Sequence, residues 1–177
     1  MIALRITNIR QIMQLMLGKN ETAFDDFLLA QATFTTSAQL AIDGHFHPAF
    51  YSEAELSDLK SEAEAAGKVF SMKMIRWGQV KSQCFDFIKG TRSPLSFMIS
   101  LYLAEENIEK FLTETDTTLR IGDIAGLSLN LKFDGSQLQC TSATSLNTFT
   151  TDRTVDRAWD QAVTKFFDRW EIPFEEL

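Results

Sequence analysis

The strongest local pattern in this sequence lies between residues 127 and 140. Apolar residues alternate with polar ones over 127–133, and the alternation resumes over 138–140 after the dipeptide Asp134-Gly135. A period of two places every second side chain on the same face of a β-strand. Asp-Gly is typical of the type I′ turn that joins two antiparallel strands. The sequence therefore predicts a β-hairpin with one buried face, so the fold must contain antiparallel sheet.

Similar patterns predict the other elements of the chain. Further strands are expected at residues 2–7, 27–36, 39–47, 69–76 and 95–103. Helices are expected at residues 9–17, 52–66, 77–90, 105–112 and 152–171. The helix over 52–66 carries the clearest start signal, because Ser52 and Glu55 have the spacing of a capping box.

The order of these elements predicts an α+β fold with a mainly antiparallel sheet. A strand-helix-strand-strand unit occurs over about 1–50 and again over about 68–145, and a closing helix follows over about 152–171. We interpret these two units as pseudo-repeated halves, on the basis of element order alone. No flexible linker interrupts the chain, so residues 1–177 are expected to form one compact domain.

Composition excludes several classes of protein. The 177 residues include 17 Lys and Arg against 24 Asp and Glu, so the net charge is −7, and 45% of the residues are hydrophobic. These values are typical of a folded globular protein. No apolar stretch is long enough to span a membrane, and the first residues lack the layout of a cleavable signal. We therefore expect a cytoplasmic protein without a membrane partner, whose two cysteines, Cys84 and Cys140, stay reduced.

Motifs for common catalytic chemistry are absent. The sequence has no P-loop, no G-x-G-x-x-G, no H-E-x-x-H and no clustered cysteines, and no serine lies in a G-x-S-x-G elbow. These absences weigh against an enzyme, and no cofactor is expected.

Positive charge is concentrated in two stretches of this acidic chain. Residues 68–92 contain six basic residues against one acidic residue, and residues 1–20 contain basic residues but no acidic one. If the halves are related by a pseudo-twofold axis, cations from both stretches come together on one face able to hold phosphates. The residues expected on this face are Arg10, Lys19, Lys81, Lys89 and Arg92. The alternative is that these charges are solvated and only balance acidic neighbours.

The only two histidines of the chain suggest a different chemistry. In a strand, Asp43, His45 and His47 project to the same face, where two imidazoles and a carboxylate could meet a divalent metal. The alternative interpretation is a polar strand face that runs into a turn at Pro48.

Three stretches together resemble a known family. They are FDDFLLAQATFTTSAQLAIDGHFH, FDFIKGTRSPLSFMISL and CTSATSLNTFTTDRTVDRAWD. They resemble a family of small bacterial proteins known only as a domain of unknown function, and the resemblance covers nearly the whole chain but implies no activity. A second resemblance is architectural, because paired strand-helix-strand-strand units with basic helices are similar to the modules of DNA sliding clamps. Since a clamp closes a ring, this resemblance implies self-association.

Three hypotheses follow for the function. The first is a non-enzymatic binding protein whose basic face holds a nucleic acid, as a clamp does, or an acidic protein partner. The second is a metal-dependent enzyme centred on Asp43, His45 and His47. The third is a structural protein that forms homo-oligomers through its sheet edges.

Overall fold

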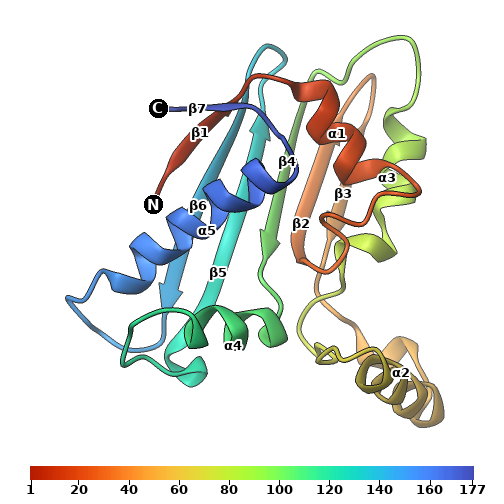
Figure 1. Ribbon diagram of the computed structural model, residues 1–177. Helices are drawn as coiled ribbons and strands as arrows, with labels where there is room; N and C mark the ends of the chain where they lie inside the picture. Colours follow the sequence, from red (N-terminus) through yellow and green to blue (C-terminus); the bar gives the residue numbers. More distant parts are fainter.

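A computed structural model describes all residues, 1–177, as a seven-stranded antiparallel sheet with five α-helices (Figure 1). The strands are β1 (Ala3–Ile6), β2 (Leu28–Thr35), β3 (Gln39–Asp43), β4 (Ser96–Tyr102), β5 (Ile124–Phe133), β6 (Leu138–Leu146) and β7 (Phe174–Glu176). The helices are α1 (Ile9–Leu17), α2 (Glu53–Ala65), α3 (Lys81–Ile88), α4 (Glu105–Thr113) and α5 (Thr154–Arg169). The predicted α+β class and the closing helix are therefore confirmed.

The predicted hairpin over 127–140 is confirmed and lies near the centre of the sheet. The strand order is β3-β2-β4-β5-β6-β1-β7, and β5 and β6 pair from Phe133↔Leu138 to Ile124↔Leu146. The prediction of a type I′ turn is wrong, because that turn needs a positive φ at both central residues. Here Gly135 has a φ of 97° but Ser136 has no positive φ. The Asp134 carboxylate instead accepts the backbone N–H groups of Gln137 and Ser136, which lowers the pKa of Asp134 to about 2.

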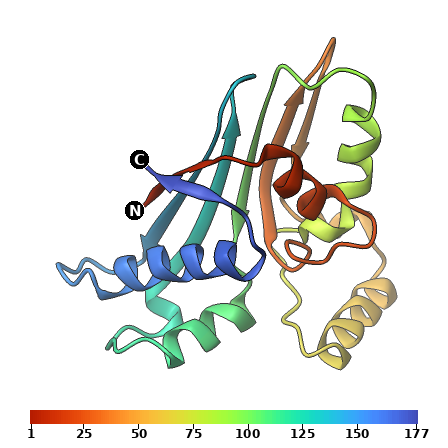
Figure 2. The ribbon, with the colours of Figure 1, turned by 45° about the horizontal axis from the view of Figure 1, so that its top comes forward.

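The two faces of the sheet differ sharply. One face, here called the covered face, carries buried residues such as Leu4, Ile99, Leu131 and Cys140. Helices α1 and α5 lie against it (Figures 1 and 2). The opposite face, here called the open face, is polar. A row across it joins Gln31, Ser100, Asn130 and Thr141, none of which is buried. The alternation of apolar and polar residues over 127–133 and 138–140 follows from this single-sided core.

The strand predicted over 69–76 is wrong. The Ser71 hydroxyl accepts the backbone N–H groups of Lys73 and Met74, which bends this segment into an irregular course. Only its last residues approach the sheet, where Ile75 lies between the ends of β2 and β3. The Ile75 N–H donates to Gly44 O at 2.9 Å, and its carbonyl accepts from Leu29 N at 2.8 Å. β2 is flanked by β4 along its length and by β3 from Gln31 onward, so only the first residues of β2 are left for this segment to pair with.

Two other boundaries differ from the sequence predictions. The helix expected over 77–90 begins at Lys81, after a short 3-10 turn over Trp77–Gln79. β3 ends at Asp43, so the strand expected over 39–47 is shorter than predicted. The capping box of α2 is confirmed, since the Ser52 and Glu55 side chains each bond the other's backbone N–H.

The arrangement of the first half limits the proposed repeat. β1 pairs with β6 and β7, whereas β2 pairs with β3 and β4. The strands of the first expected unit are therefore not contiguous in the sheet, and the second unit lacks its opening strand. The division into related halves stays a prediction. No helix in the structure has both the length and the apolar character that are needed to cross a membrane.

Candidate functional site

A groove with basic walls lies where α1 and α3 meet the loop over 89–94. Its volume is about 490 Å³. Arg10 reaches it from α1, and Lys89 and Arg92 reach it from the loop. No acidic side chain lines the groove. A second hollow, on the side of the loop that faces Thr36 and Ser37, is again lined by Lys89 and Arg92 and by no acidic residue. The loop therefore presents its cations on both of its sides, in a protein whose net charge is −7.

Packing between α1 and α3 brings these distant residues together. Trp77 is fully buried, and its indole N–H donates to the carbonyl of Met16 at 2.7 Å. This bond ties the end of α1 to the turn that precedes α3. Cys84 of α3 and Ile12 of α1 are also fully buried in the same core. Arg10 and Arg92 are far apart in the sequence. This packing brings them to the same groove.

The three cations of this groove can accept a ligand. Arg10 and Arg92 are exposed and form no ion pair or side-chain hydrogen bond within the chain. Lys89 pairs with Asp86 at 2.8 Å, but their side chains are 59% and 65% exposed. Such a surface pair contributes about 0–1 kcal/mol, so Lys89 can exchange its partner at little cost. An anion that enters the groove therefore meets three cations with no strong competing partner.

Polar and aromatic groups complete the groove. The hydroxyls of Thr91 and Ser93 line it and make no hydrogen bond within the chain. A Cβ built on Gly90 would meet no atom within 4 Å, so the space above this backbone is open. Phe85 also lines the groove, and it is 47% exposed. The groove thus combines positive charge, free hydroxyl groups and an exposed aromatic ring.

The other two residues expected on the basic face lie outside this groove. The Lys81 side chain is 8% exposed, and its ammonium donates to Glu21 O and to the Asp25 carboxylate, the latter at 2.6 Å. Lys81 therefore holds the connection before β2 in place, and its buried ammonium is already engaged by these two acceptors. Lys19 is exposed in the turn after α1 and does not line the groove.

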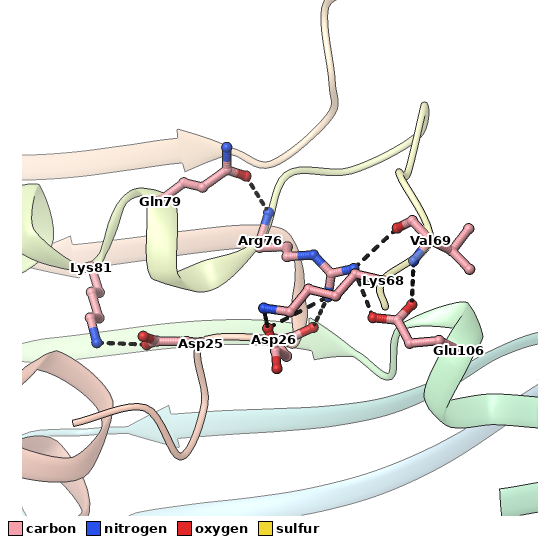
Figure 3. A network of polar contacts seen from close by, with 8 residues as sticks. All are labelled: Asp25, Asp26, Lys68, Val69, Arg76, Gln79, Lys81 and Glu106. Atoms are coloured by element: carbon pink, nitrogen blue, oxygen red, sulfur yellow. Dashed lines mark hydrogen bonds and ion pairs between the residues drawn. The ribbon is translucent and has the colours of Figure 1, made fainter. Parts of the chain in front are cut away.

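Two further cations of the basic stretch belong to an internal network (Figure 3). Lys68 pairs with Asp26 at 2.5 Å, and Arg76 pairs with Glu106 at 2.8 Å. Arg76 also donates to the carbonyls of Asp26 and Val69, at 2.9 and 3.1 Å. The network joins the irregular segment before α3 to β2 and α4. These cations therefore balance acidic neighbours, as the alternative interpretation of the charge pattern expected, but Arg76 is largely buried and not solvated.

The candidate metal ligands do not share a strand face. His45 and His47 lie beyond the end of β3, and His47 precedes a 3-10 turn over Pro48–Phe50. His45 Nδ1 lies 2.5 Å from the Asp43 carboxylate, and this hydrogen bond is the main cause of the lowered pKa of Asp43. No group of three or more His, Cys, Asp or Glu side chains is arranged to hold a metal ion.

Both cysteines are expected to be inert in the folded protein. Cys84 and Cys140 are fully buried, and burial raises the pKa of Cys84 from 9.0 to about 11 and that of Cys140 further still. A thiol-reactive chromophore should detect no thiol at neutral pH in the native protein and two after denaturation. Because the folded pKa is raised, the stabilisation from the neutral Cys84 thiol is present below pH 9.0 and is lost as the pH rises towards about 11. Rapid labelling of the native protein would contradict this burial.

These features define a class of protein: an α+β fold in which helices α1 and α5 cover one face of a seven-stranded antiparallel sheet and a basic groove opens beside α1. The family model described as Family of unknown function (DUF5721) matches residues 15–175, and the chain belongs to that family. The resemblance to a domain of unknown function is therefore confirmed. Neither a curated protein nor a solved structure matches the chain.

Proposed function

We propose that this protein is a non-enzymatic binding protein that holds a polyanion in the groove formed by Arg10, Lys89 and Arg92. The observation that carries this proposal is that all three cations line one groove whose lining contains no acidic residue, and that the one ion pair among them, Lys89 with Asp86, is exposed. Arginine guanidinium groups suit phosphate oxygens because they can donate two parallel hydrogen bonds. The unpaired hydroxyls of Thr91 and Ser93 supply further donors.

The polyanion that these features favour is a short single-stranded nucleic acid. Phe85 is exposed beside the cations, and a base can stack on such a ring whatever its sequence. The overall charge of −7 repels a long polyanion, but salt screens this repulsion beyond about 10 Å at 0.1 M ionic strength. A short segment held locally is therefore favoured over a long duplex. An acidic peptide would use the cations without needing the ring.

Reversing two charges of the groove tests this proposal. The variant Lys89→Glu with Arg92→Glu should weaken the binding of a labelled oligothymidylate at low salt by about tenfold or more, because each lost phosphate contact removes a salt-dependent contribution. Fluorescence anisotropy across a salt series measures both the affinity and its slope. The matched control is Lys60→Glu with Arg157→Glu, which makes the same change in net charge at exposed positions outside the groove. Equal losses in both variants would attribute the effect to net charge alone and remove the proposed site.

A second variant distinguishes the two classes of polyanion. Phe85→Ala should weaken oligothymidylate binding about fivefold, since stacking contributes about 1–3 kcal/mol per base. It should not change the binding of a polyglutamate peptide. If polyglutamate binds and oligothymidylate does not, the ligand is an acidic protein segment. If neither binds at low salt, the proposed function is wrong.

Self-association stays a separate prediction. The sheet is open, and its edge strands are β3 and β7. An open edge can pair with another copy of the chain, as the resemblance to sliding clamps implies. Light scattering of the purified protein distinguishes a monomer from a dimer or ring.

A further inference from the structure

A separate pocket, away from both hollows of the basic loop, lies between α4, α5 and the covered face of the sheet. Its volume is about 280 Å³, and it shares no residue with the basic groove. Most of its lining is apolar, and it includes Phe111 from α4 and Trp159 and Phe166 from α5. The rings of Phe111 and Trp159 meet edge to face, with centroids 6.0 Å apart. In both ribbon views α4 lies next to α5, which crosses the covered face of the sheet (Figures 1 and 2).

The floor of this pocket is apolar. Its largest side chain, Trp159, has no free polar group. Trp159 is only 4% exposed, and its indole N–H already donates to Ser128 O at 3.0 Å. Leu129 and Val163, which are also buried, complete the floor. A ligand that reaches this floor must therefore present hydrocarbon or an aromatic ring, since a polar group would lose its hydration without gaining a partner.

The rim of the pocket is positively charged. Lys110 of α4 and Lys165 and Arg169 of α5 line it, and all three are exposed. None of them takes part in any ion pair or side-chain hydrogen bond of the chain. Lys165 and Arg169 are one helical turn apart and lie on the same side of α5. The only acidic residue at the pocket is Glu114. The unpaired cations therefore outnumber the carboxylate at the mouth of an apolar cavity.

We infer that this pocket binds a small amphipathic carboxylate, with its apolar part against Trp159 and its carboxylate among Lys110, Lys165 and Arg169. The volume lies just below the usual range for small-molecule sites, about 300–1,000 Å³, so the apolar part must be short. The charge at the rim selects an anion over a neutral or cationic molecule of the same shape. This inference is independent of the proposed function, because the two sites share no residue.

Titration of the whole protein with octanoate tests the inference. The chain has three tryptophans, so an amide-type correlation spectrum contains three separate indole N–H signals. The Trp159 signal, assigned with Trp159→Phe, should shift on addition of octanoate, whereas the signal of fully buried Trp77 should not. Octan-1-ol, which has the same chain length without the charge, should bind about tenfold more weakly. An unchanged Trp159 signal, or equal binding of the acid and the alcohol, would overturn the inference.

Two variants separate the rim from the floor. Lys165→Glu with Arg169→Glu should weaken octanoate binding about tenfold or more and leave octan-1-ol binding unchanged. Ala162→Phe fills the pocket that Ala162 lines and should abolish the binding of both compounds. The charge-matched variant Lys60→Glu with Arg157→Glu should bind octanoate as the unmodified protein does. Calorimetry measures these affinities, and circular dichroism verifies that each variant is folded. Full octanoate affinity in the rim variant would contradict the assigned role of the cations.

Discussion

Replacing Arg76 with methionine is expected to lower the free energy of unfolding by about 3 kcal/mol. The Arg76 and Glu106 side chains are only 17% and 12% exposed, so loss of the guanidinium leaves a largely buried carboxylate without its cation. The carbonyls of Asp26 and Val69 lose hydrogen-bond donors at the same time. Methionine keeps a long unbranched chain, so little packing is lost with the charge. Urea denaturation followed by tryptophan fluorescence measures the change.

Two further variants make this prediction specific to the ion pair. Arg157 is an exposed arginine of α5, and Arg157→Met should change the stability by no more than about 0.5 kcal/mol. The double variant Arg76→Met with Glu106→Leu should recover part of the loss, because it removes the orphaned carboxylate as well. A loss below about 1 kcal/mol in Arg76→Met would show that the network does not hold the irregular segment before α3 in place.

Replacing Gly44 with alanine is expected to destabilise the protein by more than about 3 kcal/mol or to prevent folding. A Cβ built on Gly44 would lie 1.8 Å from the carbonyl oxygen and 2.5 Å from the carbonyl carbon of Leu29. Both are backbone atoms of β2, so they cannot move aside as a flexible side chain can. The Gly44 N–H also donates to Ala30 O, and its carbonyl accepts from Ile75. Relief of the clash would therefore break the junction of β2, β3 and the segment at Ile75.

The matched control for this change is Gly122→Ala. A Cβ on Gly122 would meet no atom within 4 Å, and Gly122 has no positive φ. Its replacement should leave the stability within about 0.5 kcal/mol or raise it slightly, because alanine restricts the unfolded chain. Thermal unfolding of both variants and their yields of soluble protein give the comparison. Near-equal stability of the two variants would refute the close approach at Gly44.

Elements whose pattern is local could be predicted from the sequence. The alternation over 127–133 predicts β5 correctly because this strand has one face in the core and the other open. The capping box predicts the start of α2 because both of its bonds lie within four consecutive residues. The failure at 69–76 has a nonlocal cause. Its composition suits a strand, but β2 already pairs with both β3 and β4. The pairing of both edges of β2 cannot be predicted from the residues of 69–76 alone.

The candidate site could be predicted only in part, for the same reason. Local charge density indicates Lys89 and Arg92, and the expected pseudo-twofold axis adds Arg10, but the groove that the three share depends on how α1 packs beside α3. Lys81 lies in the same basic stretch, yet its side chain is buried and pairs with Asp25. The pocket between α4 and α5 was missed because its cations are scattered among acidic neighbours in the sequence. The spacing of Lys165 and Arg169, four residues apart and flanking Phe166, was the available signal.

The open face of the sheet has a consequence for how this chain can change over time. Asn130 and Thr141 pair across β5 and β6 without entering the core, whereas their neighbours Leu131 and Cys140 are fully buried. Substitutions at alternate positions of the central strands can therefore accumulate with little effect on folding, while the intervening positions are held to a narrow range of size and polarity. A new recognition surface could arise on that side of the molecule, residue by residue, without any rearrangement of the helices behind it.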